Sequence, residues 1–204
     1  MTTNERLKEI KASFRLYMDG EVSRSMRTKG VEYFVNWGVQ LPRLREIASR
    51  YDKDAELAAA LWAERTRECK VLALLLMPPE RMTAAVATQW VAAIPSQELA
   101  EIGSLYLFQH IVEAPRLACR WLTLESEEAR ICACHVLNRC VARGLLPDVE
   151  ATTDIAESIV DAATTGGMGL RKAAFALLLR LDEATEGWST AIRETAASRD
   201  LQLF

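Results

Sequence analysis

Apolar residues recur along this chain at the three- and four-residue spacing of a helix, and glycine or proline interrupts the pattern at regular intervals. The segments between the interruptions are about 10–20 residues long, the usual length of a helix in a globular protein. No stretch shows the clean alternation of apolar and polar residues that marks a strand. The pattern therefore predicts an all-α protein with about eleven helices.

Local signals place the start of several helices. Asp54, Ser96 and Ser126 each precede acidic first-turn residues, as expected of N-capping side chains that accept hydrogen bonds from free backbone N–H groups. Pro42 suits the first turn of a helix because its φ is already fixed. Gly144 is expected to end the helix that follows Ser126.

Several segments are apolar around most of their circumference, including 71–77 and 173–179. Such helices need neighbours on more than one side. Helix pairs that recur every ~40 residues indicate a solenoid of the HEAT or armadillo kind, and a compact helical bundle is the alternative. At 204 residues the chain has the length of one domain, so we expect a single domain over residues 1–204.

No apolar run approaches the ~20 residues that a membrane helix requires, and the first residues contain no apolar signal core. We therefore expect a soluble, cytoplasmic protein. The odd number of cysteines without CxxC spacing predicts reduced, buried side chains. With only two histidines, a zinc site is the weaker interpretation. The cysteines are Cys69, Cys119, Cys132, Cys134 and Cys140.

Charge is unevenly distributed along the chain, although the net charge is only -3. Residues 1–70 contain 14 basic and 11 acidic side chains, whereas residues 71–204 contain 11 and 17. A polyanion would therefore meet the N-terminal part more favourably.

A basic segment with an aromatic cluster lies within this N-terminal part. Its cations are either phosphate contacts or an ordinary solvated face. The aromatic residues Tyr33, Phe34 and Trp37 are either base-stacking groups or core, and we expect core. Core positions are also expected for Trp62, Trp121, Trp188, His110 and His135. The cations are Arg24, Arg27, Lys29, Arg43, Arg45 and Arg50.

The stretch from Met26 to Ala48 resembles the AlkD-like DNA alkylation repair family, part of the HEAT-like repeat DNA glycosylase superfamily. Gly38-Val39 followed by Pro42 and Arg45 is similar to the family's Gly-hydrophobic-x-x-Pro-x-x-Arg turn. Leu61-Trp62, then Glu68, Lys70 and Ala73, is similar to its Leu-Trp … Glu-x-basic-x-x-Ala pattern. The resemblance is strongest over roughly residues 20–80.

This resemblance implies a curved superhelical stack of HEAT-like helix pairs with a basic concave face for duplex DNA. It implies excision of N3- and N7-alkylated purines without a metal or other cofactor. An aspartate and aromatic side chains beside the cationic base carry that activity in the family.

Two departures from the family concern its catalytic groups. Where the family has a helix containing Trp-Asp, this chain has 101–111, with neither residue type, and Glu101, Tyr106 and His110 are the substitutes. Where the family has Lys-Ala-x-x-Trp, this chain has Lys172 followed by Phe175. The resemblance therefore predicts the scaffold more firmly than the activity.

We expect a DNA-binding protein for duplex or alkylated DNA that lacks the family's catalytic aspartate, with Glu101 and Tyr106 as weak catalytic candidates. The alternative is a non-catalytic HEAT-type scaffold for a protein partner. The predicted DNA contacts are Arg27, Lys29, Arg43, Arg45, Arg130, Arg171 and Lys172.

Overall fold

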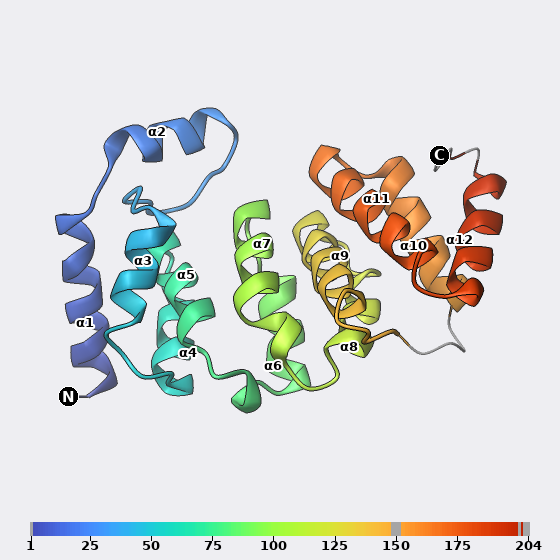
Figure 1. Cartoon of the computed structure of the whole chain (residues 1–204). Coiled ribbons are helices and arrows are strands. Elements are labelled where there is room, and N and C mark those ends of the chain that lie inside the picture. Colours follow the sequence, from blue (N-terminus) through green and yellow to red (C-terminus); the bar gives the residue numbers. More distant parts are fainter. Residues whose placement is uncertain (1, 148–151, 200, 202–204) are drawn as a thin grey trace. The chain divides into compact units, whose positions relative to one another are not determined.

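A computed structural model describes residues 2–147, 152–199 and 201. Over these residues the chain forms twelve α-helices, one more than the approximate number predicted, and three short 3₁₀ segments (Figure 1). The α-helices are α1 (Thr3–Ser13), α2 (Gly20–Thr28), α3 (Leu41–Ala48), α4 (Ala55–Ala63), α5 (Arg67–Leu76), α6 (Ala84–Ala92), α7 (Gln97–Tyr106), α8 (Ala114–Trp121), α9 (Glu127–Val141), α10 (Thr152–Thr165), α11 (Met168–Asp182) and α12 (Glu186–Ser198). The 3₁₀ segments are η1 (Phe14–Leu16), η2 (Pro79–Arg81) and η3 (Phe108–His110).

The chain divides into two compact units, Met1–Met82 and Thr83–Phe204. In unit 1, α4 packs on α5, α3 packs on α5, and α1 packs on α4. The helix α5 is buried along most of its length, as the apolar run 71–76 requires. The helix α2 is joined to α3 by a long loop, residues 29–40, visible at the top of Figure 1.

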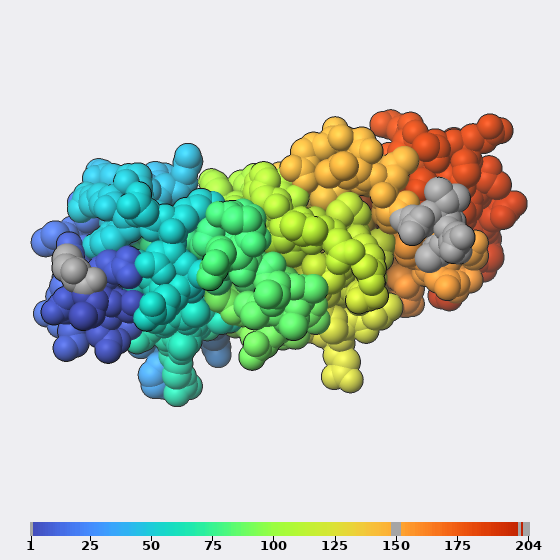
Figure 2. All heavy atoms as spheres, turned by 90° about the horizontal axis from the view of Figure 1, so that it is seen from below, coloured from blue at the N-terminus to red at the C-terminus, as the bar shows by residue number. Residues whose placement is uncertain are grey.

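Unit 2 consists of helices in two layers. The helices α7, α9 and α11 contact one another in series, while α8 packs on α9 and α10 packs on α11. The last helix, α12, covers α10 and α11. The space-filling view of Figure 2 shows atoms packed closely over the face of each unit that is in view. This layered pairing is the arrangement that the helix-pair prediction described.

The predicted helix starts are confirmed. The carboxylate of Asp54 accepts from the N–H groups of Glu56 and Leu57 at the start of α4. The hydroxyls of Ser96 and Ser126 accept from the third residue of α7 and α9, respectively. Pro42 lies in the first turn of α3, as expected. Gly144, with a φ of 76°, follows the end of α9.

The core positions predicted for three tryptophans are also confirmed. Trp62, Trp121 and Trp188 are buried, and the ring of Trp121 meets Phe108 edge-on at 5.7 Å between centroids. The indole N–H of Trp121 donates to the hydroxyl of Thr88, so this buried polar group is satisfied. His110 is exposed, and its predicted core position is therefore wrong, because it lies at the end of η3.

The cysteines lie where the sequence predicted. Cys119 is half-buried and the other four are buried, and all five are free thiols. Burial raises the pKa of Cys69, Cys119 and Cys134 to about 12, so these groups are protonated at neutral pH. Among the described residues, no cluster of His, Cys, Asp and Glu has an arrangement that would hold a metal ion, and no helix is long and apolar enough to cross a membrane.

Candidate nucleic-acid interface

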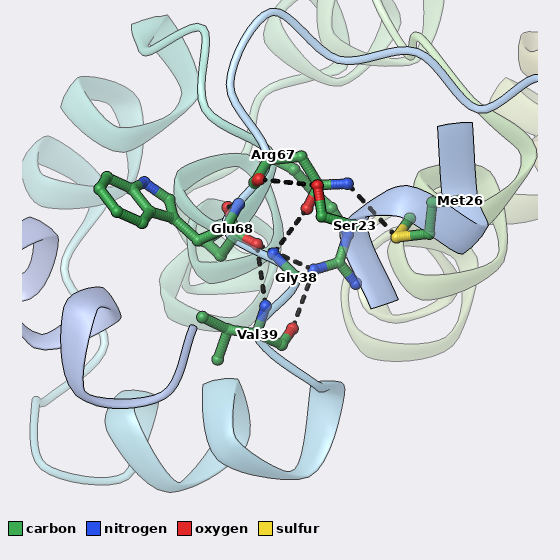
Figure 3. A network of polar contacts seen from close by, with 8 residues as sticks. Ser23, Met26, Gly38, Val39, Arg67 and Glu68 are labelled. Atoms are coloured by element: carbon green, nitrogen blue, oxygen red, sulfur yellow. Dashed lines mark hydrogen bonds and ion pairs between the residues drawn. The ribbon is translucent and has the colours of Figure 1, made fainter. Parts of the chain in front are cut away.

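The backbone of the loop between α2 and α3 is held in place by hydrogen bonds on both of its sides; Figure 3 shows most of them. The N–H of Asp19 donates to the carbonyl of Trp37, and the hydroxyl of Ser23 donates to the carbonyl of Asn36. The backbone passes Asp19 so closely that a Cβ on Gly38 would lie 2.0 Å from the Asp19 carbonyl oxygen. Gly38 also has a φ of 72°. Only glycine satisfies both requirements at this position.

On its other side, the loop is fixed by the fully buried carboxylate of Glu68 at the start of α5. Its two oxygens accept from the N–H groups of Trp37 and Val39, each at 3.2 Å. The guanidinium of Arg67, only 3 % exposed, contacts Glu68 at 3.1 Å and donates to the carbonyl of Val39 at 2.8 Å. The Gly38 turn and Glu68, which carried the family resemblance, are therefore parts of one buried polar network that positions the loop.

The same network exposes an aromatic side chain. Phe34 is 71 % exposed, whereas Tyr33 and Trp37 are half-buried. The expectation that Phe34 belongs to the core is wrong, because the backbone pairing of Val35 with 65–67 directs the preceding residue outward. The guanidinium carbon of Arg65 lies 3.7 Å from the centre of the Phe34 ring.

All six cations of the basic segment are exposed. Arg43 and Arg50 both pair with Glu46, at 2.8 and 2.9 Å, and these bonds hold the pKa of Glu46 below its usual value. The carboxylate is therefore ionised and offsets part of the charge of α3. Within the described part of the chain, Arg27 and Lys29 form no ion pair, so their charges are available to an anion. Arg24 lies 3.5 Å from the exposed Glu21.

In unit 2, the predicted DNA contacts differ in their availability. Arg130 is mostly buried and pairs with Asp161 at 3.1 Å, so it already has an anionic partner. Arg199 is the second cation near Asp161, at 4.0 Å. Arg171 and Lys172 are exposed on α11 beside Phe175, at a groove of about 570 Å³.

The weak catalytic candidates lie on α7. Glu101 is exposed, and its carboxylate accepts from the side chain of Gln97 at 2.8 Å. Tyr106 is half-buried at the end of the helix. His135 of α9 is also half-buried: burial lowers its pKa, and the charge of Glu101 partly opposes this effect. The structure thus brings Glu101 near His135, a histidine that the sequence placed in the core.

Arg65 is the residue of this surface that the sequence did not indicate. It lies 31 positions after Phe34, between Trp62 of α4 and the start of α5. Its link to Phe34 depends on a short parallel bridge between Val35 and Thr66. No local pattern in the sequence indicates such a bridge, because it pairs a single residue with a single residue and so leaves no strand periodicity.

The paired and layered helices define a HEAT-like helical-repeat protein. A family model described as "DNA alkylation repair enzyme" matches residues 9–166, and the chain belongs to this family. A solved structure with a TM-score of 0.73 is 14 % identical and covers 94 % of this chain and 82 % of its own. It represents "a new family of proteins related to the HEAT-like repeat DNA glycosylases with affinity for branched DNA structures". No curated protein matches the sequence significantly.

Proposed function

We propose that this protein binds DNA through the exposed cations around α2 and its following loop, without a metal or nucleotide cofactor. The observation that carries the proposal is the pair Arg27 and Lys29: both are exposed and form no ion pair among the described residues. A cation without an ion pair in the protein can neutralise a DNA phosphate and release its counterions, and no ion pair of the folded protein has to break. Arg43, Arg45, Arg171 and Lys172 are weaker candidate contacts.

Family membership supports this proposal, and so does the affinity for branched DNA stated for the similar structure. The charge distribution agrees with it. Unit 1 contains 15 basic and 12 acidic side chains, whereas unit 2 contains 10 and 16. We therefore assign the main electrostatic attraction to unit 1 and treat duplex DNA, plain or alkylated, as the ligand class to test.

A gel shift across a salt series tests the binding site. We expect the wild type to bind a plain duplex at ~50 mM salt and to lose affinity steeply as salt rises. The double variant Arg27→Gln/Lys29→Gln is expected to reduce the salt slope by about 2, because each lost phosphate contact contributes roughly 0.9. Arg116→Gln is the matched control, since Arg116 is exposed but pairs with Glu113 in unit 2.

The absence of any shift at low salt would reject DNA binding and leave a scaffold for a protein partner as the remaining function. The acidic composition of unit 2 favours that second candidate.

Base excision is a separate part of the same test. We propose that binding is retained while the family's catalytic aspartate is replaced, so incubation with a 7-methylguanine duplex should release no free base. Release that disappears in Glu101→Gln would instead make Glu101 the carboxylate that stabilises the cationic transition state.

A further inference from the structure

We propose that Phe34 and Arg65 together form a stacking site for an unpaired nucleobase. This inference rests on the proposed DNA binding and adds which structural feature of DNA is recognised. Phe34 is 71 % exposed, and a guanidinium already lies 3.7 Å from the centre of its ring. Aromatic rings and arginine planes are the two side-chain surfaces on which unstacked bases pack.

The positions of Phe34 and Arg65 are fixed by backbone hydrogen bonds of their neighbours, in addition to the contact between the ring and the guanidinium. The N–H of Val35 donates to the carbonyl of Arg65 at 3.3 Å, and the N–H of Arg67 donates to the carbonyl of Val35 at 2.9 Å. The next residues of the loop are fixed by Glu68. The residues that carry the ring and the guanidinium are thus ordered before DNA arrives, which lowers the entropy lost on binding.

The surroundings of Phe34 fit a nucleotide. A pocket of about 310 Å³ adjoins the ring and is lined by Ser23, Arg27, Val31, Glu32, Tyr33, Phe34 and Asn36. It contains an unpaired cation, Arg27, for a phosphate, and the carboxylate of Glu32, which accepts hydrogen bonds from the amino groups of bases. Apolar, cationic and hydrogen-bonding groups therefore converge within one small site.

The geometry favours an unpaired base over an intact duplex. In a duplex the faces of the bases are covered by their neighbours, and only edges and phosphates are presented to a protein. A ring that projects from the surface gains stacking only where a base face is free, as in gaps, bulges and junctions. Aromatic residues and arginine are also enriched at protein–protein interfaces, so the experiment must separate the two ligand classes.

The test compares two DNA molecules of equal length and nearly equal charge. One is a fully paired duplex; the other lacks three nucleotides in one strand and has 2-aminopurine in the unpaired stretch of the opposite strand. We expect the wild type to bind the gapped molecule more tightly and to quench the 2-aminopurine fluorescence on stacking. Phe34→Ala should lower the affinity for gapped DNA by about tenfold or more, while its paired-duplex affinity stays unchanged. Arg65→Lys, which keeps the charge but removes the planar guanidinium, should have the same effect. Phe34→Trp, which keeps an aromatic ring at this position, should still quench the 2-aminopurine fluorescence. Val112→Ala, which trims another exposed apolar side chain, is the control.

The outcomes separate this inference from the proposed function. If paired DNA binds but Phe34→Ala affects both molecules equally, or neither, the stacking site is rejected and DNA binding stands. If neither molecule binds at low salt, both proposals fail and a protein ligand remains for this surface. Because Phe34 is exposed, the melting temperature of its variants should match the wild type, which excludes misfolding as the cause of a loss.

Discussion

Gly38 shows at the scale of one residue why the loop before α3 has a single conformation. Its positive φ and the Asp19 carbonyl 2.0 Å from the position of a Cβ act independently against any side chain. Gly30 shares the positive φ, 78°, but a Cβ there would meet nothing within 4 Å. The two glycines therefore separate the effect of backbone conformation from that of close approach.

We expect Gly30→Ala to lower the free energy of unfolding by about 1 kcal/mol, the cost of a positive φ for alanine. Gly38→Ala should cost at least about 3 kcal/mol, since the loop must also move away from Asp19. Urea unfolding followed by circular dichroism measures both. Equal losses in the two variants would show that the loop relaxes freely and that the close approach has no energetic weight.

Residue by residue, the sequence predicted what local chemistry decides and missed what distant pairing decides. The buried tryptophans followed from their size and apolarity. Phe34 did not, because its exposure depends on the bridge from Val35 to Thr66. The ion pair of Arg130 with Asp161 was likewise not predicted, since the two residues are 31 positions apart on different helices.

At the scale of the element, the helix starts were the most predictable part of the fold. Capping depends on residues two or three positions apart, so the sequence contains the whole interaction, as at Ser96 and Ser126. The pairing of helices into layers followed from periodicity only in outline. Which helix covers which depends on long-range contacts that no local pattern contains.

Asp54 offers a direct test of one such helix start. It caps α4, and it also accepts from Arg6 of α1 at 2.7 Å. Asp54→Ala should cost about 1 kcal/mol of stability, whereas Asp54→Asn should keep the cap and lose only the ion pair. Thermal unfolding of both variants distinguishes the contributions, and an equal loss in the two would assign the whole effect to Arg6.

The pH dependence of stability gives an independent check on Asp54. The hydrogen bond from Leu57 N–H, and then Arg6, hold the pKa of Asp54 below its ordinary value of 3.8 in the folded protein. Its contribution is therefore fully present above pH 3.8 and is lost as the pH falls through the folded-state pKa. In the variant Asp54→Asn, the free energy of unfolding should therefore depend less on pH below pH 3.8. An unchanged profile would show that Asp54 is not responsible.

For the whole molecule, the family match and the contact pattern describe the chain at different levels. The match over residues 9–166 crosses the boundary between the units at 82 and 83, so both units contain parts of one inherited module. Together with the chain length, this supports the single domain over residues 1–204 that we propose. Membership of the family was predicted from residues 20–80, all of which lie in unit 1.

We predict one cooperative unfolding transition for the full chain. Scanning calorimetry should give a van't Hoff enthalpy equal to the calorimetric enthalpy. Two separable transitions would show instead that residues 1–82 and 83–204 fold as independent domains.

The buried network of Glu68 has a consequence for how members of this family are recognised. Glu68 and Gly38 fix a loop, and Lys70 donates to the carbonyl of Trp62 and packs over its ring, so the residues that reveal the ancestry of this chain support its architecture. Substitutions at these positions would disrupt the fold, whatever reaction the protein performs. A member of the family can therefore lose its catalytic residues and still be recognised by this sequence pattern. The pattern identifies the family and does not show that a member is an enzyme.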